Sequence, residues 1–265
     1  MSAAAGVGLL HVELVMGTAA SLDVRDANAT PSAIGDVIRW LHHVDETFSP
    51  YKAESPISAL GRGEIGFADV TEEIRDVLRR CEELRVETNG AFDAFSVPAP
   101  NGTTLDPSGY VKGWSIERSA EILEANGCQN FCINAGGDIA VRGEPESGEP
   151  WRIGIRHPDD RDAVATVVNG RGRLAVATSA LYERGAHIVD PRCAQPCIDL
   201  ASVTIVGADL ALADGYATAV FVMGLDGLEW IADRAGYDAY LITRDGVASW
   251  TDGFARYRAG GDTTA

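Results

Sequence analysis

The first residues whose types and spacing could support chemistry are Asp214 and Thr218, four positions apart on a predicted helix. Residues at this spacing share one helix face. Their carboxylate and hydroxyl are hard oxygen donors suited to Mg²⁺, which usually takes one or two carboxylates and completes its shell with phosphate and water. Spacing alone, however, favours a structural interpretation, in which Asp214 caps a helix and Thr218 bonds back to a carbonyl.

His187 is a second candidate, because it stands at the end of a predicted strand, just before Ile188, Val189, Asp190 and Pro191, where a loop can present its imidazole. A histidine side chain can act as a general base near neutral pH. The structural alternative is a loop histidine that is hydrogen-bonded to Asp190 or to a carbonyl, and the segment by itself favours that alternative.

Two glycine-containing segments could bring backbone N–H groups to an anion. Residues 106–113 come just before a predicted helix, where N–H groups point outward, and Lys112 adds positive charge. This segment is not a Walker loop, because its glycine spacing differs and no Ser or Thr follows the lysine. Residues 134–138 form a tight turn around Gly136 and Gly137. Neither segment reads GxGxxG, so a Rossmann nucleotide site is disfavoured.

Three further segments carry weaker signals, and each has an ordinary structural explanation. Residues 88–93 place Asp93 just past a predicted helix end, residues 48–51 place an aromatic ring in a Ser/Pro loop, and residues 16–18 interrupt a strand. Aromatic residues beside glycine loops form the walls of planar-ligand sites, but they also form ordinary cores.

Composition limits the classes of partner. The chain has 265 residues, enough for one large domain or two small ones, and a formal net charge of −17. Such a surface repels nucleic-acid phosphates and anionic lipid, so neither is an expected partner. A phosphate-bearing ligand would need help from a metal ion or from aligned N–H groups.

The sequence shows neither a recognisable targeting signal nor a membrane-spanning segment. No apolar stretch is long enough to cross a bilayer, and residues 1–16 lack the basic start of a signal peptide, so a cytoplasmic protein is expected. The five cysteines include Cys128 with Cys132 and Cys193 with Cys197, both at a spacing of four. A zinc site is weakly signalled, and reduced, mostly buried thiols are the favoured interpretation.

The elements that must position these residues mix helices and strands. Residues 9–24 form a strand broken at 16–18, Ser32 is the expected cap of the first helix, and Thr71 caps the second. We expect an α+β fold with a largely antiparallel sheet and flanking helices, one domain over residues 1–265, and a frayed tail from about 258. The predicted helices are 32–48, 71–89, 111–126, 212–223 and 225–235, and the later strands 128–134, 139–142, 151–155, 163–168, 173–178, 202–207 and 239–243.

Taken in order, the segments resemble the ApbE family, the FAD:protein FMN transferases. The resemblance spans most of the chain and implies an α+β fold with the flavin site in a cleft between two lobes. The matching segments are Met16–Thr18, Val44–Asp45, Phe48–Tyr51, Thr88–Asp93, Asp106–Gly113, Asn134–Asp138, Ala177–Ser179, His187–Pro191, Ser202–Ile205, Ala213–Thr218 and Met223–Gly224.

The resemblance also implies roles for particular residues. It places Mg²⁺ on Asp214, Thr218 and the backbone carbonyl of Gly109, which agrees with the argument from helical spacing. His187 matches the catalytic histidine. The implied FAD contacts are Met16, Ser49, Pro50, Tyr51, Asp93, Lys112, His187 and Ile188.

The implied activity is Mg²⁺-dependent transfer of FMN from FAD to a Ser or Thr hydroxyl of an acceptor flavoprotein that carries a flavinylation motif, with release of AMP. The alternatives are an FAD pyrophosphatase, a non-catalytic flavin-binding protein, and an α+β module whose motifs are all structural. Cys193-Ala194 replaces the family's usual Thr-Gly turn, Ser179-Ala180 replaces Ser-Gly, and the chain is short between Phe95 and Asp106. These departures leave the metal and FAD positions intact and concern the acceptor.

Overall fold

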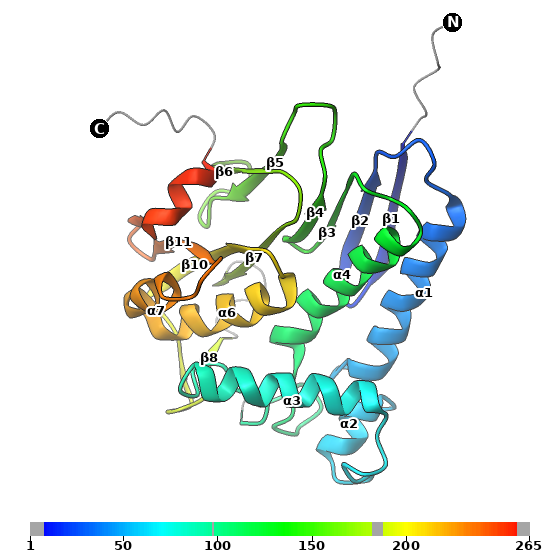
Figure 1. The fold of residues 1–265 in the computed structure, drawn as a ribbon. Helices are drawn as coiled ribbons and strands as arrows, with labels where there is room; N and C mark the ends of the chain where they lie inside the picture. Colours follow the sequence, from blue (N-terminus) through cyan, green and yellow to red (C-terminus); the bar gives the residue numbers. More distant parts are fainter. Residues whose placement is uncertain (1–7, 97, 182–187, 259–265) are drawn as a thin grey trace, which may run out of the picture.

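The computed structural model describes residues 8–96, 98–181 and 188–258, and its central feature is an eight-stranded sheet (Figure 1). Every strand pair in this sheet is antiparallel, which confirms the predicted fold class. The strand order is β1 (Leu9–Val15), β2 (Thr18–Val24), β3 (Phe131–Ala135), β4 (Asp138–Arg142), β7 (Leu174–Ala180), β10 (Leu200–Gly207), β11 (Asp238–Thr243) and β12 (Ala248–Trp250).

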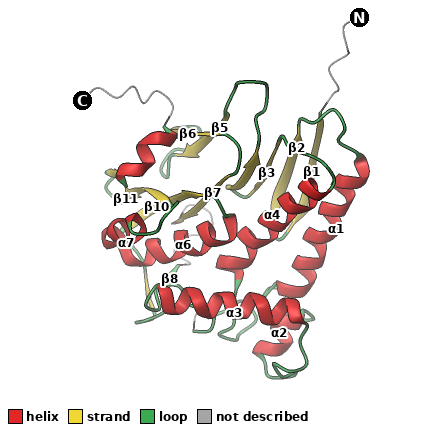
Figure 2. Cartoon of the chain, in the orientation of Figure 1, coloured by secondary structure: helices red, strands yellow, loops and turns green. Residues whose placement is uncertain are grey.

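Side chains alternate between the two faces of the sheet, and each face has its own core. In β4, Ala140 belongs to the core shared with the helices, whereas Ile139 and Val141 pack against a separate hairpin of β5 (Trp151–Arg156) and β6 (Val164–Gly170). Figure 2 shows the α-helices gathered on one side of the strands, whereas the short helix over residues 252–257 lies on the other side, beside β5 and β6. The α-helices are α1 (Pro31–Phe48), α2 (Pro56–Gly61), α3 (Glu72–Glu87), α4 (Ser108–Ala125), α6 (Leu210–Met223) and α7 (Gly227–Ala232).

Local capping chemistry sets where the helices begin. The predicted Thr71 cap of α3 is confirmed, because its hydroxyl accepts from the Ile74 N–H at 3.4 Å. The predicted Ser32 cap of α1 is wrong: Thr30 Oγ1 accepts from the Ala33 N–H, and Pro31 occupies the first helical position. Proline favours that position because its fixed φ is already helical and its missing N–H needs no partner there.

Two helix starts bear directly on the predicted site. Helix α4 begins at Ser108, whose N–H is accepted by Asp106 Oδ1 at 2.9 Å, so Gly109 lies in the first turn of the helix rather than in a loop before residue 111. Helix α6 is capped by Asp209, which accepts from the Leu212 N–H at 3.0 Å. The interpretation of Asp214 as a cap is therefore wrong, because Asp214 lies in the interior of α6.

The short helices and strands could not be predicted from the sequence, because they are too brief to show a periodic pattern of apolar residues. The predicted helix over 225–235 is split into a 3₁₀ turn, η1 (Gly224–Asp226), and α7. The unpredicted elements are α2, β8 (Val189–Asp190), β9 (Gln195–Pro196), β12 and a 3₁₀ helix, η2 (Asp252–Tyr257). Most of the predicted frayed tail, residues 259–265, lies outside the described residues. In the described part of the chain, no helix is both long and apolar enough to cross a membrane.

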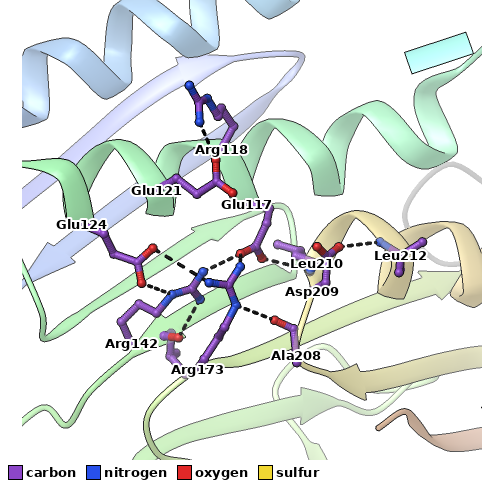
Figure 3. A network of polar contacts seen from close by, with 11 residues as sticks. Glu117, Arg118, Glu121, Glu124, Arg142, Arg173, Ala208, Asp209, Leu210 and Leu212 are labelled. Carbon is purple, nitrogen blue, oxygen red and sulfur yellow. Dashed lines mark hydrogen bonds and ion pairs between the residues drawn. The ribbon is translucent and has the colours of Figure 1, made fainter. Parts of the chain in front are cut away.

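A buried ionic network fixes α4 against the sheet and α6 (Figure 3). Glu117 of α4 is 4% exposed, and its carboxylate accepts from the guanidinium groups of Arg142 in β4 and Arg173 just before β7. Its second oxygen accepts from the Leu210 N–H, at the start of α6, at 3.0 Å. Arg142 also donates through Nε to Glu124 at 2.8 Å. Glu124 lies about two turns after Glu117 along α4. The network therefore sets the relative position of α4 and α6.

Candidate functional site

A cavity of about 910 Å³ brings together segments that are far apart in the sequence. Its size lies near the upper end of the roughly 300–1,000 Å³ that ligand pockets usually occupy. The eleven predicted site residues include one, His187, that lies outside the described residues. The other ten all line this cavity: Met16, Ser49, Pro50, Tyr51, Asp93, Gly109, Lys112, Ile188, Asp214 and Thr218.

The three predicted metal ligands meet where α4 crosses α6. A Cβ atom placed on Gly109 would lie 3.1 Å from Thr218 Oγ1, so the first turn of α4 lies beside this hydroxyl. Asp214 is buried, and its Oδ2 accepts from the Gly113 N–H at 2.8 Å. In an α-helix the N–H of residue 113 bonds the carbonyl of residue 109, so the Asp214 carboxylate competes with the Gly109 carbonyl for this donor.

Gly113 is a point of close approach between the two helices. A Cβ atom at this position would lie 2.3 Å from the Leu210 carbonyl oxygen and 2.6 Å from Asp214 Cβ. We expect Gly113→Ala to lower the free energy of unfolding by about 1–3 kcal/mol, because the helices must separate to admit the methyl group. Equilibrium denaturation in urea measures this effect.

Gly35→Ala in α1 is the matched control for that substitution. Its Cβ would meet only Arg39 Nη1, at 3.4 Å, so the variant should be more stable than the wild type by about 0.5–1 kcal/mol. If Gly113→Ala unfolded at the same urea concentration as Gly35→Ala, the close packing of α4 on α6 would be contradicted.

Lys112 is held in the cavity wall by the carboxylate of Asp138, which was not among the predicted site residues. Its Nζ lies 2.7 Å from Oδ2 of Asp138, a buried residue at the start of β4. Asp138 Oδ1 accepts from the Thr178 N–H at 3.0 Å, and Thr178 Oγ1 lies 2.9 Å from Thr204 Oγ1. The only sequence signal for Asp138 is its place in the glycine turn at 134–138. Asp138 therefore orients the lysine.

Met16 and Tyr51 contribute apolar and aromatic surface to the cavity. Met16 forms the β1–β2 turn with Gly17, and its φ of 53° lies in the left-handed region, which a methionine rarely adopts. Tyr51 is 64% exposed, so much of its ring is open to solvent. The Asp93 carboxylate accepts from the Phe95 N–H at 2.7 Å, which fixes the segment after α3. A planar ring system could pack against such surfaces.

Negative charge dominates the described wall of the cavity. Asp45, Asp93, Asp106 and Asp214 line it, against the two ammonium groups of Lys52 and Lys112. Each ammonium group already has a carboxylate beside it, Asp45 for Lys52 and Asp138 for Lys112. This wall would repel an anionic diphosphate, and a cation beside the diphosphate would offset that repulsion.

The hairpin of β8 and β9 forms another part of the wall. The Ile188 carbonyl accepts from the Cys197 N–H at 3.0 Å, and hydrogen bonding to Arg192 lowers the pKa of Asp190. Ala194 has a φ of 57°, in the left-handed region that glycine adopts freely. The Cys193-Ala194 replacement thus keeps a glycine-like turn, at an expense of about 1–2 kcal/mol for a residue with a Cβ.

The cysteines do not form a metal centre in the described structure. All five are free thiols, and burial raises the pKa of Cys132 to about 12 and that of Cys197 to about 11. Cys81 and Cys128 are buried, whereas Cys193 is exposed. Within the described ranges, no group of three or more His, Cys, Asp or Glu side chains could hold a metal ion. The weak zinc signal gains no support.

The sheet, the helical layer and the cavity together define an α+β protein with a cavity of ligand size. The profile of the ApbE family matches residues 16–101 and 95–241, and the chain belongs to this family. Two relatives named FAD:protein FMN transferase are a Haemophilus influenzae protein, 30% identical over 62% of this chain and 50% of its own length, and a Vibrio cholerae protein, 31% identical over 69% and 54%. The chain spans about half the length of these curated relatives.

Solved structures agree on the fold. The ApbE protein from Thermotoga maritima superposes with a TM-score of 0.85 and 21% identity, covering 96% of this chain and 100% of that one. The flavin transferase ApbE from Vibrio cholerae gives a TM-score of 0.81 and 22% identity, covering 95% and 99%. At such identities the likeness establishes the architecture alone.

Proposed function

We propose that this chain is a Mg²⁺-dependent FAD:protein FMN transferase, which moves FMN from FAD to a Ser or Thr hydroxyl of an acceptor flavoprotein and releases AMP. The observation that carries the proposal is the meeting of Asp214, Thr218 and Gly109 at the wall of a large acidic cavity. Family membership and the names of the relatives support the same reaction.

The donor set at the crossing of α4 and α6 fits magnesium. Asp214 supplies a carboxylate, Thr218 a hydroxyl and Gly109 a backbone carbonyl, all hard oxygen donors, and one carboxylate is the usual number for Mg²⁺. Because the cavity wall is acidic, such a cation would favour the binding of a diphosphate. When bound, Mg²⁺ would neutralise the charge that develops on the diphosphate as AMP leaves.

The chain's own residues would then bind and orient the reactants. Lys112, held by Asp138, would contact a phosphate oxygen, and the ring of Tyr51 would pack on a planar part of FAD. We propose His187 as the general base that removes the proton from the acceptor hydroxyl, so that the hydroxyl oxygen can attack the FMN phosphorus. We also propose that the whole chain acts as one domain; its cytoplasmic location stays a prediction.

A single assay separates this proposal from its rivals. The protein is incubated with FAD, MgCl₂ and a candidate acceptor flavoprotein, followed by in-gel flavin fluorescence and chromatography of the nucleotides. Transfer predicts a fluorescent acceptor and an equal amount of AMP, and both should disappear when EDTA removes the metal. FMN and AMP without a labelled protein would indicate an FAD pyrophosphatase. FAD binding without AMP would indicate a non-catalytic flavin-binding protein.

A further inference from the structure

The edge strand β1 carries an exposed apolar stripe that the proposed function does not use. Leu10, Val12 and Leu14 alternate along the strand and are 74%, 56% and 77% exposed. His11 and Glu13 lie between them on the opposite face, where Glu13 Oε1 contacts His42 Nε2 of α1 at 2.8 Å. In the described chain, β2 is the only strand beside β1, so the outer edge of β1 has no strand partner.

The two edges of the sheet differ in a way that singles out β1. At the far edge, β12 has three residues, and a short edge strand is a common protection against pairing with other chains. Strand β1 has seven residues, contains neither proline nor glycine, and keeps a continuous register with β2. A long, regular, apolar edge of this kind is a template for another strand.

The turn that joins β1 to β2 determines which backbone groups face outward. Met16 and Gly17 both have positive φ, as in the two-residue type I′ hairpin, where the flanking residues, Val15 and Thr18, form a hydrogen-bonded pair. Hydrogen-bonded pairs alternate along an antiparallel ladder. The N–H and C=O groups of Leu10, Val12 and Leu14 therefore point away from β2.

We propose that β1 pairs with β1 of a second copy of this chain, antiparallel about a two-fold axis at Val12. In this register Leu10 lies opposite Leu14 of the copy, Val12 opposite Val12, and His11 opposite Glu13. The segment Leu10–Leu14 is thus self-complementary: apolar residues face apolar residues and each imidazole faces a carboxylate. Such an interface is isologous, as in most homodimers.

The pairing of polar side chains favours this register over its neighbours. Moving the two-fold axis to residue 11 places His11 opposite His11 and leaves Glu13 opposite Leu9. Moving it to residue 13 places two Glu13 carboxylates opposite each other, and directly opposed like charges destabilise a strand pair. Only the axis at Val12 places each Glu13 carboxylate opposite an imidazole, which can donate a hydrogen bond to it.

Sedimentation velocity over a range of protein concentrations tests the proposal. The wild-type chain should sediment with twice the 28.1 kDa mass of one chain. Val12→Lys should sediment as a monomer at the same concentrations, because the axis would bring two ammonium groups together. Val247→Lys, between β11 and β12, changes a residue of nearly equal exposure, 55%, and should remain dimeric. A monomeric wild type, or a dimeric Val12→Lys protein, would overturn the proposal.

A cysteine at the axis tests the register independently. Paired Cα atoms in a hydrogen-bonded antiparallel pair lie about 5.5 Å apart, so two thiols at the axis lie within reach of a short bis-maleimide cross-linker. Treated with a short bis-maleimide, Val12→Cys should give a covalent dimer whose linked peptide joins residue 12 to residue 12. Val247→Cys accounts for background cross-linking through the native cysteines. A linkage at residue 12 no more abundant than in that control would refute the register.

Discussion

Replacing Asp214 by asparagine is expected to lower the rate of FMN transfer about a thousandfold while the protein stays folded. A thousandfold is about 4 kcal/mol of transition-state stabilisation, in line with the several kcal/mol that a bound metal supplies. The amide oxygen of asparagine can still accept from the Gly113 N–H, so the contact between α4 and α6 survives. The amide NH₂ group, however, replaces an oxygen donor and removes the negative charge.

The experiment measures AMP release as a function of MgCl₂ concentration, together with the melting temperature of each variant. Asp209→Asn is the matched control, because Asp209 caps the same helix and asparagine caps as well as aspartate. That control should keep the wild-type rate and melting temperature. Full activity of Asp214→Asn at high MgCl₂, or an equal loss in Asp209→Asn, would remove Asp214 from the proposed metal site.

Replacing Glu117 by alanine is expected to give the largest loss of stability, about 3–5 kcal/mol. The substitution removes the acceptor for the Leu210 N–H and for two guanidinium groups. Arg142 is itself almost fully buried, and its remaining carboxylate partner is Glu124. Removing one partner of a buried ion pair lowers the stability strongly, because the other charge then stays buried without a compensating partner.

Glu121→Ala on the same helix is the matched control, because it removes a glutamate carboxylate that is exposed instead of buried. Glu121 pairs with Arg118 on the surface of α4, and an exposed pair of this kind contributes about 0–1 kcal/mol (Figure 3). Equilibrium urea denaturation of both variants should show a large shift of the midpoint for Glu117→Ala and a small one for Glu121→Ala. Equal shifts would show that Glu117 contributes only a surface interaction.

Local patterns were sufficient to predict the longer elements. The cap at Thr71 and the apolar spacing behind it define α3, and the interruption at residues 16–18 separates β1 from β2. The sequence failed where two local signals compete within a few residues. Thr30 and Ser32 are both good caps, and Pro31 between them decides in favour of Thr30. Short elements such as β12 depend on pairing with a neighbour, so no local pattern reveals them.

The sequence by itself determined that Asp214 and Thr218 share a helix face, because that relation depends only on the helical repeat. The family resemblance implied that this face meets Gly109, but only the tertiary structure shows that Gly109 lies in the first turn of α4. The Gly113 N–H and Asp214 Oδ2 are separated by 101 positions in the chain, and Lys112 reaches Asp138 from a different element. Such contacts depend on how helices and strands pack, and packing is fixed by the whole core and by the Glu117 network rather than by any local stretch of residues.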